Sequence, residues 1–130
     1  SYDAWVETDV FMTAVQRVMD VLPAVCSFEV DLFVPFIPPM QGSRLNVAGI
    51  AGRVDVGCDG TSIEVKFCNS LTDEHELQNL LYAAMNCISN NSDIGRSTLF
   101  NSRTAGSLVH EISNECAHRL LREVARLKAC

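Results

Sequence analysis

The segments Gly52-Arg53-Val54-Asp55 and Ile63-Glu64-Val65-Lys66, joined through a turn at Cys58-Asp59-Gly60, decide the fold of this chain. Asp-Gly between two runs rich in β-branched residues is among the strongest short-range signals for a hairpin. The flanking runs have that character over Ala48 to Gly57 and Thr61 to Cys68. The sequence therefore predicts two antiparallel strands across this turn.

Three ionisable side chains stand out in the predicted hairpin. Alternate side chains of a strand share a face, so Glu64 and Lys66 project together. Asp55 projects away from its apolar neighbours Val54 and Val56. A lone carboxylate in an apolar strand is costly unless a cation or a salt bridge compensates it. Carboxylates from adjacent strands suit Mg²⁺ or Mn²⁺, and a lysine beside them can orient water or stabilise negative charge. The alternative is a structural ion pair of Lys66 with Asp55 or Glu64 in an ordinary sheet.

A third feature follows downstream, where Gln78 and Tyr82 lie four residues apart in a helical pattern. Together with Gly52-Arg53-Val54-Asp55 and Glu64-Val65-Lys66, this array resembles the PD-(D/E)XK nuclease superfamily, specifically its RecB-like exonuclease branch. Val54 stands where the superfamily often has proline, and the RecB-like branch accepts an apolar residue there. The match is more specific than a single Glu-x-Lys tripeptide, because three spaced motifs agree in order.

The resemblance implies a metal-dependent nuclease that hydrolyses phosphodiester bonds. The family's catalytic positions correspond to Asp55, Glu64, Lys66, Gln78 and Tyr82. The aspartate and the glutamate would hold Mg²⁺ or Mn²⁺, with the backbone carbonyl of Val65 as a further ligand. The lysine would assist the attacking water. The glutamine and the tyrosine would help to fix the lysine and the nucleic-acid backbone.

Several properties stay open after this comparison of motifs. Family members carry an acidic residue on a first helix, for which Glu7 or Asp9 could serve, and Glu29 opens the first predicted strand. Exposed acids without a ligand role are the alternative at all three positions. The RecB-like branch favours DNA, but viral RNA-cleaving endonucleases share the core. The residues do not decide DNA against RNA, endonuclease against exonuclease, or one metal ion against two.

Length and composition indicate one globular domain. The chain has 130 residues, of which 48% are hydrophobic and 20% charged, and no apolar run approaches the roughly 18 residues of a membrane span. We expect a single soluble domain over residues 1–130, and excision from a larger protein is an open alternative. The six cysteines form no C-x-x-C pair, and Cys116 and Cys130 are too far apart for the iron–sulfur set of some RecB-like nucleases. Reduced cysteines indicate an intracellular protein, nuclear or cytoplasmic, with a viral origin possible.

The net charge of −6 opposes binding to a polyanion, because nucleic-acid affinity rests on Lys and Arg. A bound metal ion would partly reverse the local potential, and neighbouring domains could supply the rest. The main basic cluster lies late in the chain, at Arg119, Arg122, Arg126 and Lys128. A catalytically silent nuclease-fold module that binds nucleic acid or protein is therefore the second hypothesis.

Hydrophobic periodicity predicts an α/β domain with a mixed central sheet of about four strands flanked by helices, in the order α-β-β-β-α-β-α. This is the order of a restriction-endonuclease-like core. Beyond the hairpin, the predicted helices and strands span 8–22, 26–37, 73–90, 97–101 and 107–127. A turn is expected at Gln41 to Arg44. The helix at 73–90 is expected to bury one apolar stripe, made of Leu77, Leu80, Leu81, Ala84, Met85 and Ile88. The last helix is expected to face the core with Leu108, Ile112, Cys116, Leu120 and Val124 or Leu127.

Overall fold

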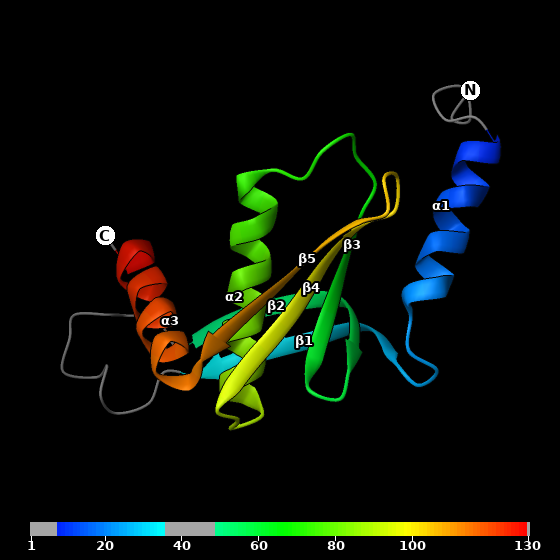
Figure 1. Cartoon of the computed structure of the whole chain (residues 1–130). Coiled ribbons are helices and arrows are strands. Elements are labelled where there is room, and N and C mark those ends of the chain that lie inside the picture. Colours follow the sequence, from blue (N-terminus) through cyan, green and yellow to red (C-terminus); the bar gives the residue numbers. More distant parts are fainter. Residues whose placement is uncertain (1–7, 36–48, 130) are drawn as a thin grey trace.

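The computed structural model describes residues 8–35 and 49–129 as a mixed α/β domain (Figure 1). Its three helices and five strands follow one another as α1 (Thr8–Val21), β1 (Ser27–Pro35), β2 (Gly49–Cys58), β3 (Thr61–Lys66), α2 (Asp73–Ser89), β4 (Ile94–Asn101), β5 (Gly106–Ser113) and α3 (Asn114–Ala129). The predicted hairpin is confirmed. The predictions for Glu7, for the end of the first strand at Ile37 and for a turn at Gln41 to Arg44 lie outside the described residues.

The five strands form one sheet in the order β1-β2-β3-β4-β5. Neighbouring strands are antiparallel except β3 and β4, which are parallel because α2 returns the chain to the same end of the sheet. Asp59 and Gly60 join β2 to β3 with φ angles of 50° and 75°. Both angles are positive, as a two-residue hairpin turn requires. The motif strands β2 and β3 thus lie inside the sheet, with a neighbour on each side.

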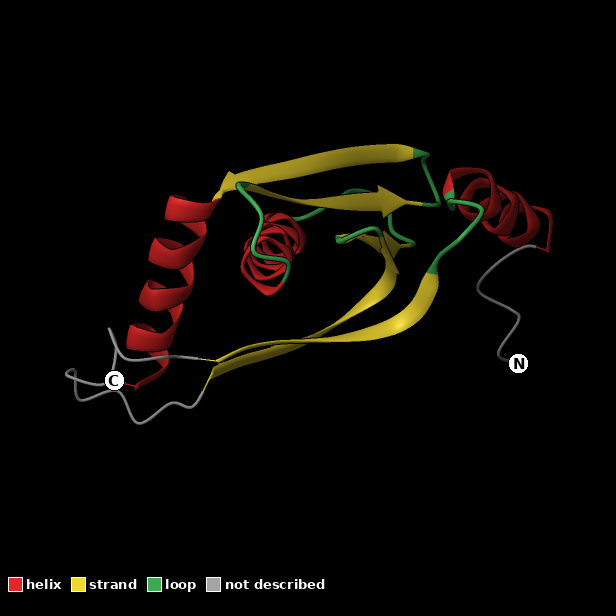
Figure 2. Cartoon of the chain, turned by 90° about the horizontal axis from the view of Figure 1, so that it is seen from below, coloured by secondary structure: helices red, strands yellow, loops and turns green. Residues whose placement is uncertain are grey.

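The sheet curls around α2, which lies between the β1–β2 pair and the β4–β5 pair (Figure 2). Gly95 permits this close packing, because a Cβ atom there would lie 2.0 Å from the Ala83 carbonyl oxygen and 2.5 Å from Cys87 Cβ. The helix is therefore buried around most of its circumference. Its fully buried residues are Asn79, Tyr82, Ala83, Ala84, Met85, Asn86 and Cys87.

This enclosure corrects the simple apolar stripe expected for the helix. Ala84 and Met85 are buried as expected, but Leu77 is 54% exposed. Asn79 and Asn86 are instead buried, at 0% and 3% exposure. A helix that packs against strands on two sides has no single buried face, so a one-face pattern misplaces its polar residues.

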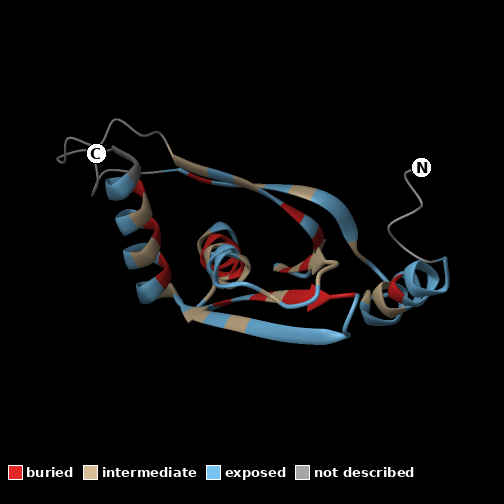
Figure 3. Cartoon of the chain, turned by 90° about the horizontal axis from the view of Figure 1, so that it is seen from above, coloured by how far each residue is buried: buried red, intermediate tan, exposed pale blue. Residues whose placement is uncertain are grey.

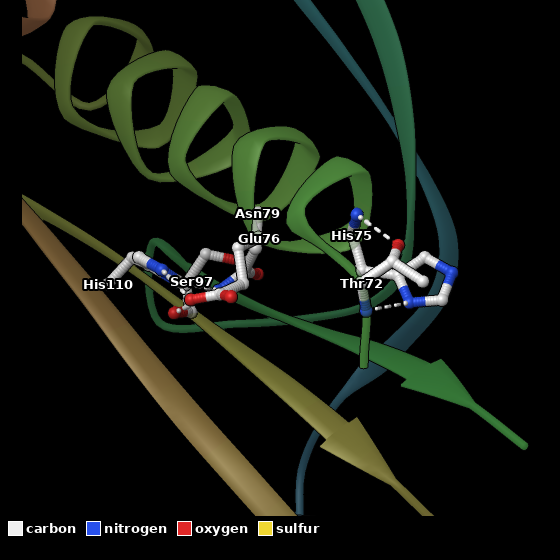
Figure 4. Close-up of polar contacts among 6 residues, drawn as sticks. All are labelled: Thr72, His75, Glu76, Asn79, Ser97 and His110. Carbon is white, nitrogen blue, oxygen red and sulfur yellow. Dashed lines mark hydrogen bonds and ion pairs between the residues drawn. The ribbon is translucent and has the colours of Figure 1, made fainter. Parts of the chain in front are cut away.

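The start of α2 is fixed by a capping box (Figure 4). The His75 backbone N–H donates to Thr72 Oγ1 at 3.2 Å, and the Thr72 N–H donates to His75 Nδ1 at 3.1 Å. Two N–H groups that the helix cannot satisfy internally are thereby paired. His75 therefore has a structural role at the helix terminus.

The C-terminal region differs from the predicted single helix over residues 107–127. Residues 106–113 form β5, which pairs with β4, and α3 begins only at Asn114. Leu108 and Ile112 lie four residues apart, a spacing that suits one helix face and one strand face equally. When the same four-residue spacing is continued into α3, it predicts the wrong buried face. Cys116 is exposed, whereas Ala117, Leu121 and Ala125 are buried.

Helix α1 forms as predicted from Thr8 but lies to one side of the sheet, and much of its surface is exposed (Figure 3). Phe11, Met12 and Met19, for example, are 55%, 57% and 61% exposed. Arg17 ties the helix to the β4–β5 turn by donating to the backbone carbonyls of Ser102 and Arg103. Within the part of the chain that is described, no helix has the length and apolar character to cross a membrane.

Candidate active site

The backbone ladder between β2 and β3 ends at the pair Val56–Ile63. The next opposed residues are Asp55 and Glu64, and here side chains replace the backbone acceptors. The Asp55 N–H donates to Glu64 Oε1 at 2.9 Å, and the Val65 N–H donates to Asp55 Oδ2 at 2.8 Å. Each carboxylate thus binds the backbone of the opposite strand, and the two acids are held close together.

The two carboxylates differ in their surroundings. Glu64 is buried, with 4% of its surface exposed, whereas Asp55 is exposed. Burial raises the pKa of Glu64, and the negative charge of Asp55 raises it further. The Asp55 N–H and the charge of Lys66 act in the opposite direction but do not cancel the increase in pKa. A cation beside this pair would relieve both the burial and the repulsion of the negative charges.

Lys66 lies at the end of β3, where the following strand fixes its backbone. The Ser102 N–H and Oγ both donate to the Lys66 carbonyl oxygen, at 2.8 and 3.0 Å. Asn101 holds the next turn, since its amide donates to the Cys68 carbonyl and accepts from the Cys68 N–H. Among the described residues, the Lys66 ammonium has no hydrogen-bond or ion-pair partner. Asn101 and Ser102 therefore place the lysine backbone and leave its ammonium group available.

Asn101 and Ser102 carry no local sequence pattern that would assign them to the site. The strand topology indicates them, because β4 runs parallel to β3 and pairs Asn101 with Lys66. The residues that end β4 therefore lie beside the end of β3, which carries Glu64 and Lys66. This pairing becomes visible only once the order of the strands is known.

Gln78 and Tyr82 lie on the predicted shared face of α2. The Gln78 amide donates to the Tyr82 hydroxyl at 3.3 Å, and that hydroxyl donates to the Arg53 carbonyl at 3.1 Å. Burial raises the pKa of Tyr82, and the charges of Glu64 and Asp55 add to the increase. The tyrosine is thus close to both acids, and it contacts the backbone of the strand that carries Asp55 rather than Lys66.

Gly49 and Gly52 lie inside β2, where a glycine usually marks a close approach of other atoms to the space that a side chain would fill. The structure shows that protein atoms occupy these spaces. A Cβ atom at Gly52 would lie 3.0 Å from Tyr82 Cε1, and one at Gly49 would lie 2.5 Å from the Val34 carbonyl oxygen. Gly52 therefore allows Tyr82 to pack against the strand that carries Asp55.

The other acids that were considered lie elsewhere. Glu29 is exposed and has a φ angle of 50°. The hydrogen bond and charge of Asp31 raise the pKa of Arg53, and the charge of Glu29 adds to this increase. Asp31 hydrogen-bonds directly to Arg53 at 2.8 Å. Asp9 is exposed in the first turn of α1. Glu29 thus belongs to a surface charge cluster around Arg53.

A second polar cluster crosses the interior between α2 and the strands (Figure 4). Asn79 donates to the Ser97 carbonyl and contacts His110 Nδ1 at 2.7 Å, and Ser97 Oγ donates to Asn79 Oδ1. Glu76 Oε1 lies 3.9 Å from His110 Nε2. Ser97 has 0% exposure and is hydrogen-bonded, so it cannot meet a substrate as a nucleophile. This cluster joins α2 to the sheet.

The donor set around Asp55 and Glu64 is small. Within residues 8–35 and 49–129, no group of three or more His, Cys, Asp or Glu side chains is positioned to hold a metal ion. Two carboxylates can suffice for Mg²⁺, which usually keeps several waters and binds proteins through one or two carboxylates. The hydrogen bonds above occupy one oxygen of each acid. The donors present are therefore compatible with a hydrated divalent ion.

No family model matches the chain, and no curated protein matches it. Among solved structures, it is similar to the crystal structure of SSO0001, at a TM-score of 0.49 and 15% identity. The similarity covers 95% of this chain and 62% of the other, so this chain spans less than two thirds of that structure's length.

Proposed function

We propose that this domain is a metal-dependent nuclease with a restriction-endonuclease-like core of the PD-(D/E)XK type, in its RecB-like form. The observation that carries the proposal is the reciprocal pair of hydrogen bonds from the Asp55 N–H to Glu64 and from the Val65 N–H to Asp55. These bonds hold two carboxylates together near Lys66, where the backbone ladder between two internal strands ends. An ordinary sheet would continue its backbone ladder here, without two adjacent acids.

Asp55 and Glu64 would hold Mg²⁺ or Mn²⁺, and the Val65 carbonyl is the third candidate donor. A divalent ion bound there lowers the pKa of a coordinated water and stabilises charge on a phosphate. The raised pKa of Glu64 supports this assignment, because a cation favours the charged form that burial and Asp55 disfavour. The backbone hydrogen bonds from Asp55 and Val65 keep the acids oriented before a ligand arrives.

Lys66 would orient the attacking water and stabilise negative charge on the phosphate. Its backbone is anchored by Ser102, whereas its ammonium has no partner among the described residues. The positive charge acts on Glu64, since it lowers the pKa of that group. A lysine that is placed but not neutralised by a salt bridge can stabilise developing charge.

The proposed substrate is nucleic acid, with DNA favoured over RNA. Near Lys66, Arg103 lies over the Phe67 ring at 5.2 Å, and Arg17 is bound to the Arg103 carbonyl. Lys66, Arg103 and Arg17 are the cations that would bind the phosphates, in a chain whose net charge is −6. Further domains of a larger protein would supply additional affinity. We expect weak binding of nucleic acid by the domain alone.

The experiment combines thermal melting with a cleavage assay. Mn²⁺ at millimolar concentration should raise the melting temperature by mass action on the folded state. Asp55→Asn should remove this response, whereas Asp31→Asn should keep it, because Asp31 is an exposed acid on the adjacent strand. End-labelled single-stranded DNA, duplex DNA and RNA of one sequence are then compared as substrates.

The outcomes distinguish a nuclease from a catalytically silent module. Metal-dependent cleavage that Asp55→Asn abolishes and Asp31→Asn preserves supports the nuclease, and preferential cleavage of RNA would correct the substrate. Binding of nucleic acid without cleavage at any Mn²⁺ or Mg²⁺ concentration would favour the catalytically silent module. An unchanged melting temperature in both metals together with no cleavage would overturn the proposal.

A further inference from the structure

Two cysteines lie just beyond the end of the ladder between β1 and β2. Cys58 is the last residue of β2, and Cys26 immediately precedes β1. The ladder between these strands starts at the pair Ser27–Gly57. One step beyond this pair, the antiparallel register places Cys26 directly opposite Cys58.

The hydrogen bonds of β2 determine whether Cys26 and Cys58 would form a hydrogen-bonded or a non-hydrogen-bonded antiparallel pair. Cys58 pairs with Thr61 across the two-residue turn, so its backbone N–H and C=O point toward β3. These groups therefore point away from β1, so Cys58 and Cys26 form a non-hydrogen-bonded cross-strand pair. Such pairs have Cα atoms about 4.5 Å apart and the closer side chains. This separation lies within the 4.4–6.8 Å that disulfides span.

The side-chain contacts agree with the register. Cys58 Sγ donates to the carbonyl oxygen of Val25 at 2.9 Å, so the thiol already reaches across to the residue beside Cys26. Both cysteines are free and half-buried. Both also line a cavity of about 310 Å³ whose wall includes Val54 and Asn86. A small reagent in this cavity would reach both sulfur atoms.

The thiol of Cys58 is held in its protonated form. Burial raises its pKa, the charge of Asp59 adds to the increase, and Cys26 contributes as a further nearby acid. Because the thiolate is the reactive species, the raised pKa slows the reaction of Cys58 as a nucleophile. The other described cysteines, Cys68, Cys87 and Cys116, lie on elements that place none of them opposite another cysteine on a neighbouring strand.

We propose that Cys26 and Cys58 form a reversible disulfide bond by exchange with a low-molecular-weight disulfide such as oxidised glutathione. The Cys26 thiolate attacks one sulfur of oxidised glutathione, which forms a mixed disulfide and releases one glutathione thiolate. The Cys58 thiolate, after losing its proton to solvent, attacks the Cys26 sulfur and releases the second glutathione thiolate. Two protein thiols are oxidised, and one glutathione disulfide is reduced to two thiols.

The bond would join the residue before β1 to the turn between β2 and β3. It encloses β1 and most of β2, so it restricts the unfolded chain and stabilises the fold. Asp55 lies three residues before Cys58 on the same strand. Oxidation would therefore rigidify the strand that carries this acid.

The experiment equilibrates the full chain with reduced and oxidised glutathione at several ratios and quenches the thiols with acid. The oxidised protein should be lighter by the mass of two hydrogen atoms, and peptide mapping should recover Cys26 linked to Cys58. Its melting temperature should rise by on the order of 5–10 °C and return to the starting value with dithiothreitol. Cys26→Ser and Cys58→Ser should each lose both effects, whereas Cys116→Ser, an exposed cysteine on α3, should keep them.

Several results would overturn the proposal. These are glutathione adducts at Cys26 or Cys58 without the intramolecular link at any thiol ratio, or a dominant link between other cysteines. A Cys58→Ser variant that still gains stability on oxidation would also exclude it. If Cys58→Ser is poorly folded, Cys58→Ala and Cys26→Ala give the same mass and mapping readout. Activity is not needed, so the result is independent of the proposed nuclease function.

Discussion

Asp55 and Glu64 face each other across β2 and β3 at the point where the backbone ladder gives way to carboxylate acceptors. Glu64 accepts the N–H of Asp55, and Asp55 accepts the N–H of Val65. The same two hydrogen bonds therefore satisfy the backbone N–H groups of Asp55 and Val65 and hold the two acids close together. A substitution that keeps the acceptor but removes the charge can separate these two roles.

Lys66→Ala should abolish cleavage and leave metal binding largely intact. The lysine ammonium has no lone pair for a metal ion, and its backbone anchor to Ser102 does not depend on the side chain. The measurement is single-turnover cleavage together with the Mn²⁺-induced rise in melting temperature. Arg122→Ala, an exposed cation on α3, is the control and should cleave normally. Cleavage that persists in purified Lys66→Ala would assign the activity to other residues.

Glu64→Gln should raise the melting temperature of the metal-free protein near pH 7. The pKa of Glu64 is raised in the folded state, so its charged form opposes folding above that pKa. As the pH falls through the folded pKa, wild-type Glu64 takes up a proton and this cost disappears. The advantage of Glu64→Gln should therefore shrink toward about pH 4, near the ordinary pKa of a glutamate.

Glu123→Gln is the matched control for this pH experiment. The hydrogen bond from Arg126 lowers the pKa of Glu123, so its charged form favours folding. The Gln variant at this exposed position should gain no stability at neutral pH. If Glu64→Gln is less stable than wild type at every pH, burial and the charge of Asp55 do not make the charged form of Glu64 costly in the folded protein.

The hairpin and the motif positions could be predicted from sequence because their signals are local. Asp59-Gly60 requires positive φ angles, and alternation alone separates Asp55 from Val54 and Val56. Gln78 and Tyr82 share a helix face by spacing alone, and they do contact each other. Their contact with the Arg53 carbonyl depends on how α2 sits in the curled sheet, which no local pattern specifies.

The C-terminal strand was missed because its apolar spacing fits two kinds of structure. Leu108 and Ile112 are compatible with one face of a helix or of a strand, and only pairing with β4 decides between them. Burial of Asn79 was missed for a related reason. Its amide is satisfied by Ser97 and His110, which belong to strands that are distant in sequence. Tertiary pairing therefore determines both features.

Gly95→Ala should destabilise the fold severely, by about 3 kcal/mol or more. The new Cβ atom would lie 2.0 Å from the Ala83 carbonyl oxygen, which belongs to the backbone of α2 and cannot move alone. Chemical denaturation measures the loss. Gly106→Ala is the control, because its Cβ atom would meet only the Thr104 hydroxyl at 3.2 Å. Equal stabilities for the two variants would show that α2 packs less closely on β4 than described.

Tyr82→Phe and Gln78→Ala should lower cleavage without removing it. The Tyr82 hydroxyl binds the Arg53 carbonyl, two residues before Asp55, and Gln78 orients that hydroxyl. Loss of the hydroxyl should cost about 1 kcal/mol of folding stability, as is typical for one hydrogen bond. Residues that support a metal ligand typically contribute about 10- to 100-fold to activity or affinity. Both variants should therefore fall between wild type and Asp55→Asn in single-turnover rate, with Gln78→Ala closer to wild type because its contact with the strand is indirect. Wild-type rates for both variants across a range of substrate concentrations would make this part of α2 a scaffold alone, and the RecB-like assignment would lose its most specific support.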